Sequence, residues 1–268
     1  MYDILIIGSG PAGLSAAITA RARGKSVAVI SNSAAESGLC RAPLIANYPG
    51  LPGMSGAELS DRLVSHARGL GAAIITGRVV SALPLKGGFS VGWGGEFESG
   101  GALILALGAV QTSVFPGETE LLGRGVSYCA TCDGMLYRGK RVVVVPLAPD
   151  AGAEAGYLRS IGCLVTEVTA DDIEILGGDK VKSVSADGES IPCDGVFILR
   201  ETVAPSALLR GIETRGGYIK TDETMSASVR GVFAAGDCAG GVKQIAKAVG
   251  EGQRAAFSAI SYIEGAGA

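Results

Sequence analysis

The feature that most restricts the fold of this chain is a glycine-rich turn close to its beginning. Residues 2–7 (YDILII) have the continuous apolar character of a buried strand, and Gly8–Gly13 (GSGPAG) follows directly, opening an alanine-rich helix over residues 11–23. In such a motif the first glycine permits the tight turn, the second lets a pyrophosphate approach the backbone, and the third lets helix and strand pack closely. The helix N-terminus then faces the phosphates. The motif therefore predicts a dinucleotide site, with an unliganded glycine turn as the alternative.

Strands and helices alternate along the rest of the chain. Apolar strands that alternate with helices indicate parallel sheets covered on both faces, so the expected fold class is α/β. The predicted strands are 26–30, 102–107, 141–145, 163–168, 181–185, 194–199 and 231–235, and the predicted helices are 59–70, 151–161 and 242–263.

Composition and charge argue against several classes of protein. The formal net charge of −3 disfavours a nucleic-acid partner. No apolar run reaches the roughly 18 residues that a membrane span needs. A first strand that starts at Tyr2 leaves no room for a signal peptide, and six cysteines without a secretion signal favour a cytoplasmic protein over a disulfide scaffold.

The residue that would hold the ribose departs from the usual pattern. An acidic side chain is ordinarily found about 20 residues after the glycine turn. Here the second strand ends at Ser31 and Asn32. One of these two is expected to bond the ribose, with Glu36 as a less favoured substitute.

A second motif lies far along the chain, at Gly231–Asp237 (GVFAAGD). A strand that runs into Gly-Asp places a carboxylate at the carboxyl edge of a sheet, ahead of another helix. Together with the N-terminal turn, this resembles the second FAD fingerprint of flavoproteins with two dinucleotide-binding domains. The resemblance implies that Asp237 bonds the ribityl chain. The strand 102–107 followed by Gly108 resembles a linking motif near FAD in the same proteins, with Leu107 in place of a usual threonine.

The third motif is a cysteine pair in Cys129–Gly134 (CATCDG). A C-x-x-C outside a secreted scaffold indicates redox or metal chemistry. A structural zinc site would need a second ligand pair, and the only histidine, His66, lies on a polar helix. Two thiols three positions apart at a helix start can close a reducible disulfide. In the dithiol form, the helix end favours a thiolate. Asp133 is suited to proton transfer, the alternative being a helix-terminal carboxylate without a catalytic task.

These motifs together resemble the low-molecular-weight thioredoxin reductases over nearly the whole chain. The resemblance rests on Gly8–Gly13, 47–50 (NYPG), 106–108 (ALG), Cys129–Gly134, Gly236-Asp237 and Gln244. It implies an FAD domain formed by residues 1–116 and 214–268. Inserted into it, at 117–213, is a second domain of reduced size, which carries the cysteines and in the family normally binds NADPH. It also implies that one cysteine interacts with the flavin, that the other attacks a thioredoxin disulfide, and that the enzyme is a homodimer.

The resemblance assigns the candidate residues one by one. Asp133 would protonate the leaving thiolate, and no metal is expected. The expected catalytic residues are Cys129, Cys132 and Asp133, and the expected FAD-binding residues are Gly8, Ser9, Gly10, Pro11, Ala12, Gly13, Ser31, Asn32, Asn47, Gly108, Gly236, Asp237, Gln244 and Ile245.

The inserted domain departs from the family pattern where NADPH should bind. In register, the family's phosphate-binding glycines fall on Pro146, Leu147 and Ala148. Proline removes an N–H that could bond phosphate, and the other side chains fill space that a pyrophosphate needs. Where the family has basic residues for the 2′-phosphate, this chain has Thr169-Ala170-Asp171. Residues 146–200 carry 10 acidic and 4 basic side chains, a charge that repels phosphate.

The expected electron donor is therefore ferredoxin rather than NADPH. The whole chain resembles a branch of these reductases that lacks pyridine-nucleotide motifs and takes electrons from ferredoxin. Because ferredoxins are acidic, Lys243, Lys247 and Arg254 are candidates to steer one, unless they form an ordinary solvated helix face. The alternatives are a deazaflavin donor, NAD(P)H with Asp171 on the ribose, and a non-enzymatic flavin redox sensor.

Overall fold

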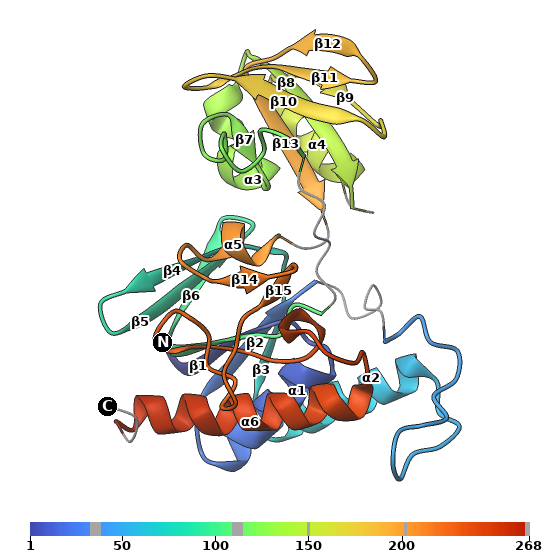
Figure 1. The fold of residues 1–268 in the computed structure, drawn as a ribbon, viewed down its shortest axis with the longest axis vertical. Helices are drawn as coiled ribbons and strands as arrows, with labels where there is room; N and C mark the ends of the chain where they lie inside the picture. The colour runs from blue at the N-terminus through green and yellow to red at the C-terminus, as the bar shows by residue number, and fades with distance from the viewer. Residues whose placement is uncertain (33–38, 109–114, 149–150, 201–202, 266–268) are drawn as a thin grey trace. The chain divides into compact units, whose positions relative to one another are not determined.

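The structure is a computed structural model that describes residues 1–32, 39–108, 115–148, 151–200 and 203–265 (Figure 1). The chain forms two compact units, 1–111 with 204–268 and 112–203. The domain limits expected from the sequence, 116/117 and 213/214, lie five and ten residues further along the chain. Helix α5 (Pro205–Leu208) packs against strand β4 (Val79–Leu85), so the second crossing between units precedes α5.

The first unit is built on a sheet whose central strand is β1. Strand β1 pairs in parallel with β2 on one side and β6 on the other, and the parallel part of the sheet continues to β3 and β16. Helices α1 and α6 lie along each other beneath the sheet in Figure 1 and share its buried core. The elements are β1 (Tyr2–Ile7), α1 (Pro11–Ala22), β2 (Val27–Ser31), α2 (Gly56–Gly69), β3 (Ala73–Thr76), β6 (Glu96–Leu105), β14 (Thr214–Arg215), β15 (Tyr218–Ile219), β16 (Val232–Ala234), η3 (Asp237–Ala239) and α6 (Ile245–Ile263).

The same sheet contains an antiparallel extension that the sequence analysis does not predict. Strand β5 (Gly88–Trp93) pairs antiparallel with β4 and with the first half of β6, so β6 begins six residues before the predicted strand. Glycine and serine interrupt these strands and hide their apolar alternation. A Cβ at Gly100 would lie 2.7 Å from Cγ of Leu5, so the close approach to β1 requires glycine there. The sheet is mixed, and the fold class remains α/β.

Two helices begin at other residues than expected. Helix α2 starts at Gly56 instead of 59, because Ser55 and Glu58 form a capping box in which each side chain accepts from the other's backbone N–H. The Ser55 N–H and the Ser55 hydroxyl both donate to the Glu58 carboxylate, and these two bonds lower the pKa of Glu58. Helix α6 starts at Ile245, three residues later than predicted.

The second unit has a parallel sheet in the order β7-β13-β8-β9. One face packs against α3 and α4, and the other packs against an antiparallel sheet of β10, β11 and β12, of which only β11 was predicted. The elements are β7 (Val126–Ser127), α3 (Ala130–Asp133), η2 (Gly134–Tyr137), β8 (Arg141–Leu147), α4 (Ala151–Ser160), β9 (Leu164–Glu167), β10 (Ile173–Gly177), β11 (Val181–Ala186), β12 (Glu189–Pro192) and β13 (Gly195–Arg200). Among the described helices, none is long and apolar enough to cross a membrane.

Candidate functional sites

The glycine turn after β1 has a geometry that only glycine satisfies at two of its positions. Gly8 has a φ of +109°, and a Cβ there would lie 2.1 Å from the carbonyl oxygen of Ala106. A Cβ at Gly13 would lie 1.9 Å from the carbonyl oxygen of Gly8. The first and third glycines are therefore required by the fold itself, as tight turn and close helix–strand packing demand.

Gly10 differs from its two neighbours in the motif because it faces open space. It is the N-cap of α1 with ordinary extended backbone (φ −73°), and a Cβ placed on it meets no atom of the described residues within 4 Å. No side chain in the described part of the chain caps the helix, and Pro11 begins it without needing an N–H acceptor. An open cradle beside uncapped helix N–H groups fits a pyrophosphate.

The end of β2 lies against this turn, as the sequence analysis expects for the ribose position. The hydroxyl of Ser31 hydrogen bonds to the hydroxyl of Ser9 over 2.7 Å, and both residues and Asn32 are half-buried. Glu36, the less favoured substitute, lies outside the described residues.

The Gly-Asp motif lies beside the first glycine turn although the two are more than 220 residues apart. A Cβ at Gly236, which has a φ of +84°, would lie 3.0 Å from Cβ of Ala12. Asp237 follows and is half-buried, and none of the described residues hydrogen bonds to its carboxylate. The next residue, Cys238, is fully buried, and burial raises the pKa of its thiol to about 11, so it remains a protonated core residue.

Two residues of α6 hold the Gly236 peptide and were not singled out as cofactor residues from the sequence. The Glu251 carboxylate accepts from the Gly236 N–H at 2.9 Å, and the Lys247 ammonium donates to the Gly236 carbonyl at 3.1 Å and to the Gly240 carbonyl. Lys247 and Glu251 also pair with each other at 3.1 Å. In the sequence, the only sign of this pair was the i,i+4 spacing of Lys247 and Glu251 on a predicted helix.

This clamp argues against Lys247 as one of the candidate steering charges. Its side chain is only 18% exposed and its charge is engaged with Glu251. Arg254 is exposed and donates to the carbonyl of Glu223, while Lys243 is exposed but precedes α6 instead of lying on it.

The remaining expected FAD residues lie around the start of α6 and the end of β6. The side-chain amide of Asn47 donates to Gln244 over 2.8 Å, joining positions 197 residues apart. Gln244 is the N-cap of α6 and Ile245 its first residue. Gly108 has a φ of +71° and faces open space.

The cysteine pair of the second unit forms a disulfide across the first turn of α3. The Cα atoms of Cys129 and Cys132 are 5.3 Å apart. Cys129 is buried and is the N-cap, with its Sγ accepting from the Cys132 N–H at 3.1 Å, whereas Cys132 is exposed. In the dithiol, the same contact favours a thiolate at Cys129.

Asp133 lies at the end of this turn with a defined partner. The buried Ser127 hydroxyl donates to its carboxylate at 2.7 Å and accepts from the Cys129 N–H at 3.2 Å. The pKa of Tyr137 is raised by burial and, to a smaller extent, by the Asp133 charge. Serine thus ties the acid to the backbone of the first cysteine.

The edge where a nucleotide would enter the second unit is closed by the strand itself. β8 continues through Pro146 and Leu147, which pair in register with Leu199 and Arg200 of β13. The Arg200 guanidinium forms a buried ion pair with Glu118, which also accepts from the hydroxyl of Tyr128 at 2.9 Å.

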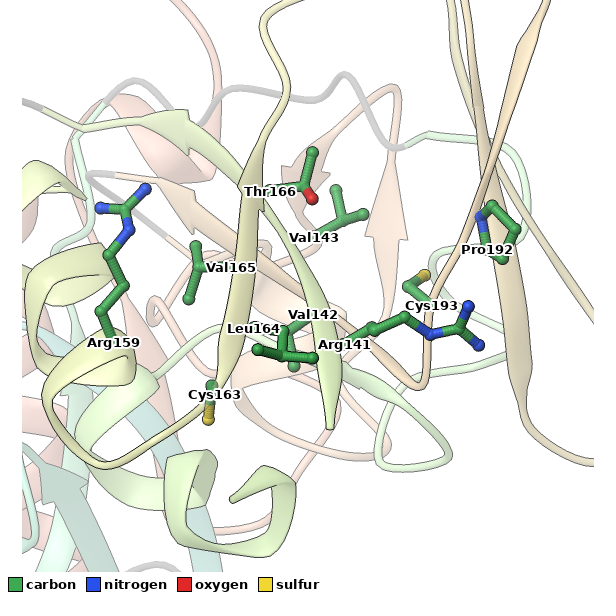
Figure 2. Close-up of a pocket in the computed structure, with 10 residues that line it drawn as sticks. All are labelled: Arg141, Val142, Val143, Arg159, Cys163, Leu164, Val165, Thr166, Pro192 and Cys193. Atoms are coloured by element: carbon green, nitrogen blue, oxygen red, sulfur yellow. The ribbon is translucent and has the colours of Figure 1, made fainter. Parts of the chain in front are cut away.

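A pocket of about 500 Å³ lies elsewhere in the second unit, around the first residues of β8 and β9 (Figure 2). Arg159 and Arg141 line it, but they pair with Glu167 at 2.6 Å and Asp194 at 3.9 Å. Two cysteines line it, and burial raises the pKa of both thiols, that of Cys193 to about 11 and that of Cys163 in the same direction. This pocket therefore presents no reactive thiol.

Comparison with known proteins adds to this geometry. The family described as pyridine nucleotide-disulphide oxidoreductase matches residues 2–173 and 159–252. A thioredoxin reductase of Listeria innocua is 35% identical, covering 98% of this chain and 94% of its own length. A ferredoxin-flavin thioredoxin reductase from Clostridium acetobutylicum has 37% identity and a TM-score of 0.89, covering 99% of this chain and 98% of its own. A thioredoxin reductase from Gloeobacter violaceus has 30% identity and a TM-score of 0.80, covering 100% and 95%.

Proposed function

The chain belongs to the pyridine nucleotide-disulphide oxidoreductase family, among the thioredoxin reductases, and from this premise we propose that it passes electrons from ferredoxin to a thioredoxin. The proposed carriers are FAD in the first unit and the Cys129–Cys132 pair in the second. We propose further that the enzyme works as a homodimer.

The proposed FAD site uses the open cradle at Gly10 for the pyrophosphate and the Asp237 carboxylate for the ribityl chain. Both fit, because the first offers uncapped helix N–H groups and the second is a half-buried acceptor that no described residue engages. Ser31 or Asn32 would hold the ribose, and Asn47, Gln244 and Ile245 would face the ring. When bound, FAD supplies a carrier that accepts electrons singly and reduces a disulfide with two.

The cysteine pair then carries out disulfide exchange. Two electrons and two protons convert the Cys129–Cys132 disulfide into a dithiol. One thiol gives its proton to Asp133 and, as a thiolate, attacks the thioredoxin disulfide. This forms a mixed disulfide and releases a thioredoxin thiolate, which takes that proton from Asp133. The second cysteine attacks the mixed disulfide, which restores Cys129–Cys132 and releases the second thioredoxin thiol.

The observation that carries the donor proposal is the pairing of Pro146 and Leu147 with β13. A dinucleotide site needs free backbone N–H groups in a turn at the end of the strand. Here the backbone continues in the sheet, Pro146 has no N–H, and the segment that follows is acidic. A one-electron carrier protein needs only a docking surface near the flavin, and the solved structure with 37% identity is a ferredoxin-flavin thioredoxin reductase.

The test is an anaerobic assay in which this protein, a thioredoxin and one donor are mixed and free thiols are counted. Photoreduced ferredoxin is expected to drive thiol formation, and the rate should fall as salt rises because charged surfaces guide the encounter. NADPH, NADH and a reduced deazaflavin, each supplied alone, serve as the comparison. Thiol formation from NADPH at the rate given by ferredoxin would contradict the proposal, and a deazaflavin-only response would reassign the donor.

Replacing Asp133 by asparagine is expected to slow thioredoxin reduction by about 10²-fold while FAD stays bound, since the leaving thiolate loses its proton donor. The measurement is the turnover rate from pH 6 to 9 with thioredoxin in excess. Asp179→Asn, an exposed acid in the turn before β11, is the matched control. A wild-type rate for Asp133→Asn across this range would make Asp133 a structural residue only.

A further inference from the structure

Helix α4 packs directly on the turn that carries the disulfide. A Cβ at Gly134 would lie 2.9 Å from Cδ2 of Leu158 and 3.0 Å from Cδ1 of Ile161. Ala130 and Ala155 are fully buried in the same core cluster. The helix that would follow a nucleotide turn therefore supports the redox helix.

The contact between the two helices includes a hydrogen bond beside the disulfide. The Glu154 carboxylate, in the first turn of α4, accepts from the backbone N–H of Ala130 at 3.0 Å. Ala130 is the first residue of α3 and follows Cys129 directly, so its N–H is one of the donors that a helix start leaves without an intrahelical partner. Glu154 is half-buried, which limits solvent screening of its charge.

Three other kinds of titratable group lie around the pair, namely an acid, two phenols and a cation. Asp133 is the second acid, on α3 itself, with its carboxylate bonded to Ser127. The neighbouring phenols, Tyr137 and Tyr128, have a raised pKa and stay neutral. On α4, the cation Arg159 is engaged with Glu167 of β9.

We propose that Glu154 is a positioning residue that fixes the first turn of the redox helix and keeps its dithiol strongly reducing. The inference rests on the proposed function only in taking Cys129 and Cys132 as a working redox couple. The N–H of Cys132 favours a thiolate at Cys129, which stabilises the dithiol and makes the disulfide a better oxidant. A carboxylate one peptide away acts in the opposite direction, because it raises the thiol pKa. The dithiol then transfers its electrons to thioredoxin more readily.

The test compares Glu154→Gln with the wild-type holoprotein. Glutamine can still accept from the Ala130 N–H, so this change removes the charge and keeps the bond. Each protein is reduced with excess dithiothreitol, desalted anaerobically and alkylated with iodoacetamide at a series of pH values, with the rate followed at Cys129 and Cys132 by mass spectrometry. The apparent thiol pKa is expected to fall by about half a pH unit or more in Glu154→Gln.

The second measurement is the equilibrium of each protein with reduced and oxidised dithiothreitol. At pH values above the thiol pKa, a fall of half a unit shifts this equilibrium about threefold toward the dithiol in Glu154→Gln. Glu189→Gln, an exposed acid on β12, is the control and is expected to match the wild type.

An unchanged thiol pKa and an unchanged equilibrium in Glu154→Gln would overturn the proposal, whether or not the variant loses thermal stability. Neither measurement uses ferredoxin, NADPH or thioredoxin. An incorrect donor therefore leaves the result intact, whereas a pair that cannot be reduced and reoxidised would defeat the proposed function itself.

Discussion

Replacing either Cys129 or Cys132 by serine is expected to abolish thioredoxin reduction, to the uncatalysed background. The two sulfurs form the one disulfide among the described residues, and each exchange step needs both a thiolate and a resolving thiol. The two cysteines belong to the second unit, whereas the glycine turn and the Gly-Asp motif belong to the first, so the purified variants should remain yellow. The measurements are the anaerobic thiol count and the flavin absorbance.

The matched control for these variants is Cys163→Ser in the same unit. The Cys163 thiol is buried and donates to the carbonyl of Tyr137 at 3.2 Å, a bond that a serine hydroxyl can also make. This variant should turn over at close to the wild-type rate. Substantial turnover by Cys129→Ser or Cys132→Ser would show that electrons reach thioredoxin by another route.

Changing Gly10 to glutamate is expected to remove FAD from the protein without unfolding it. The backbone of Gly10 suits any residue, and its Cβ direction is open for 4 Å, so the apoprotein has room for the side chain. The new carboxylate would stand where the pyrophosphate is proposed to lie. Like charges brought together cost several kcal/mol, which corresponds to a loss of affinity of about 10³-fold.

The readouts for this change are the FAD content after purification, the Kd for added FAD, and the melting temperature of the apoprotein. Gly69→Glu is the control, because Gly69 is an exposed glycine at the end of α2 with equally open space around it. It should retain FAD. Full flavin occupancy in Gly10→Glu would remove the glycine turn from the proposed site.

The sequence was informative wherever apolar runs and turn chemistry coincide. The strand 2–7 and the helix after it were predictable because a buried apolar run ends at a glycine whose positive φ the turn requires. The hairpins of β4–β6 were not, because glycine and serine replace the alternating apolar residues that would have marked them. Strand β10 was missed for a related reason, since its alternation spans only the five residues 173–177.

The candidate site shows the same division. Motif spacing made Gly8–Gly13, Asp237 and the cysteine pair candidates, because each is a local pattern with a direct chemical meaning. The partners that hold these residues, namely Glu251 at Gly236 and Glu154 at Ala130, come from other elements, 15 and 24 residues away along the chain. Such long-range contacts follow from tertiary packing, which one sequence does not encode as a local pattern.

The backbone pairing between the end of β8 and β13 stands in the way of a phosphate-binding turn at this position. Glycines placed at positions 146–148 would change composition, yet the segment would still be held straight by its register with Leu199 and Arg200. Freeing the backbone for a phosphate turn would break the pairing of residues 146 and 147 with β13. The partner of Leu147 in this pairing is Arg200, whose side chain forms a buried ion pair with Glu118. Displacing the Arg200 side chain from this pair would be strongly destabilising, by about 3–5 kcal/mol. A phosphate turn at positions 146–148 would therefore require more than one substitution, because both the strand pairing and the surroundings of the ion pair would have to change.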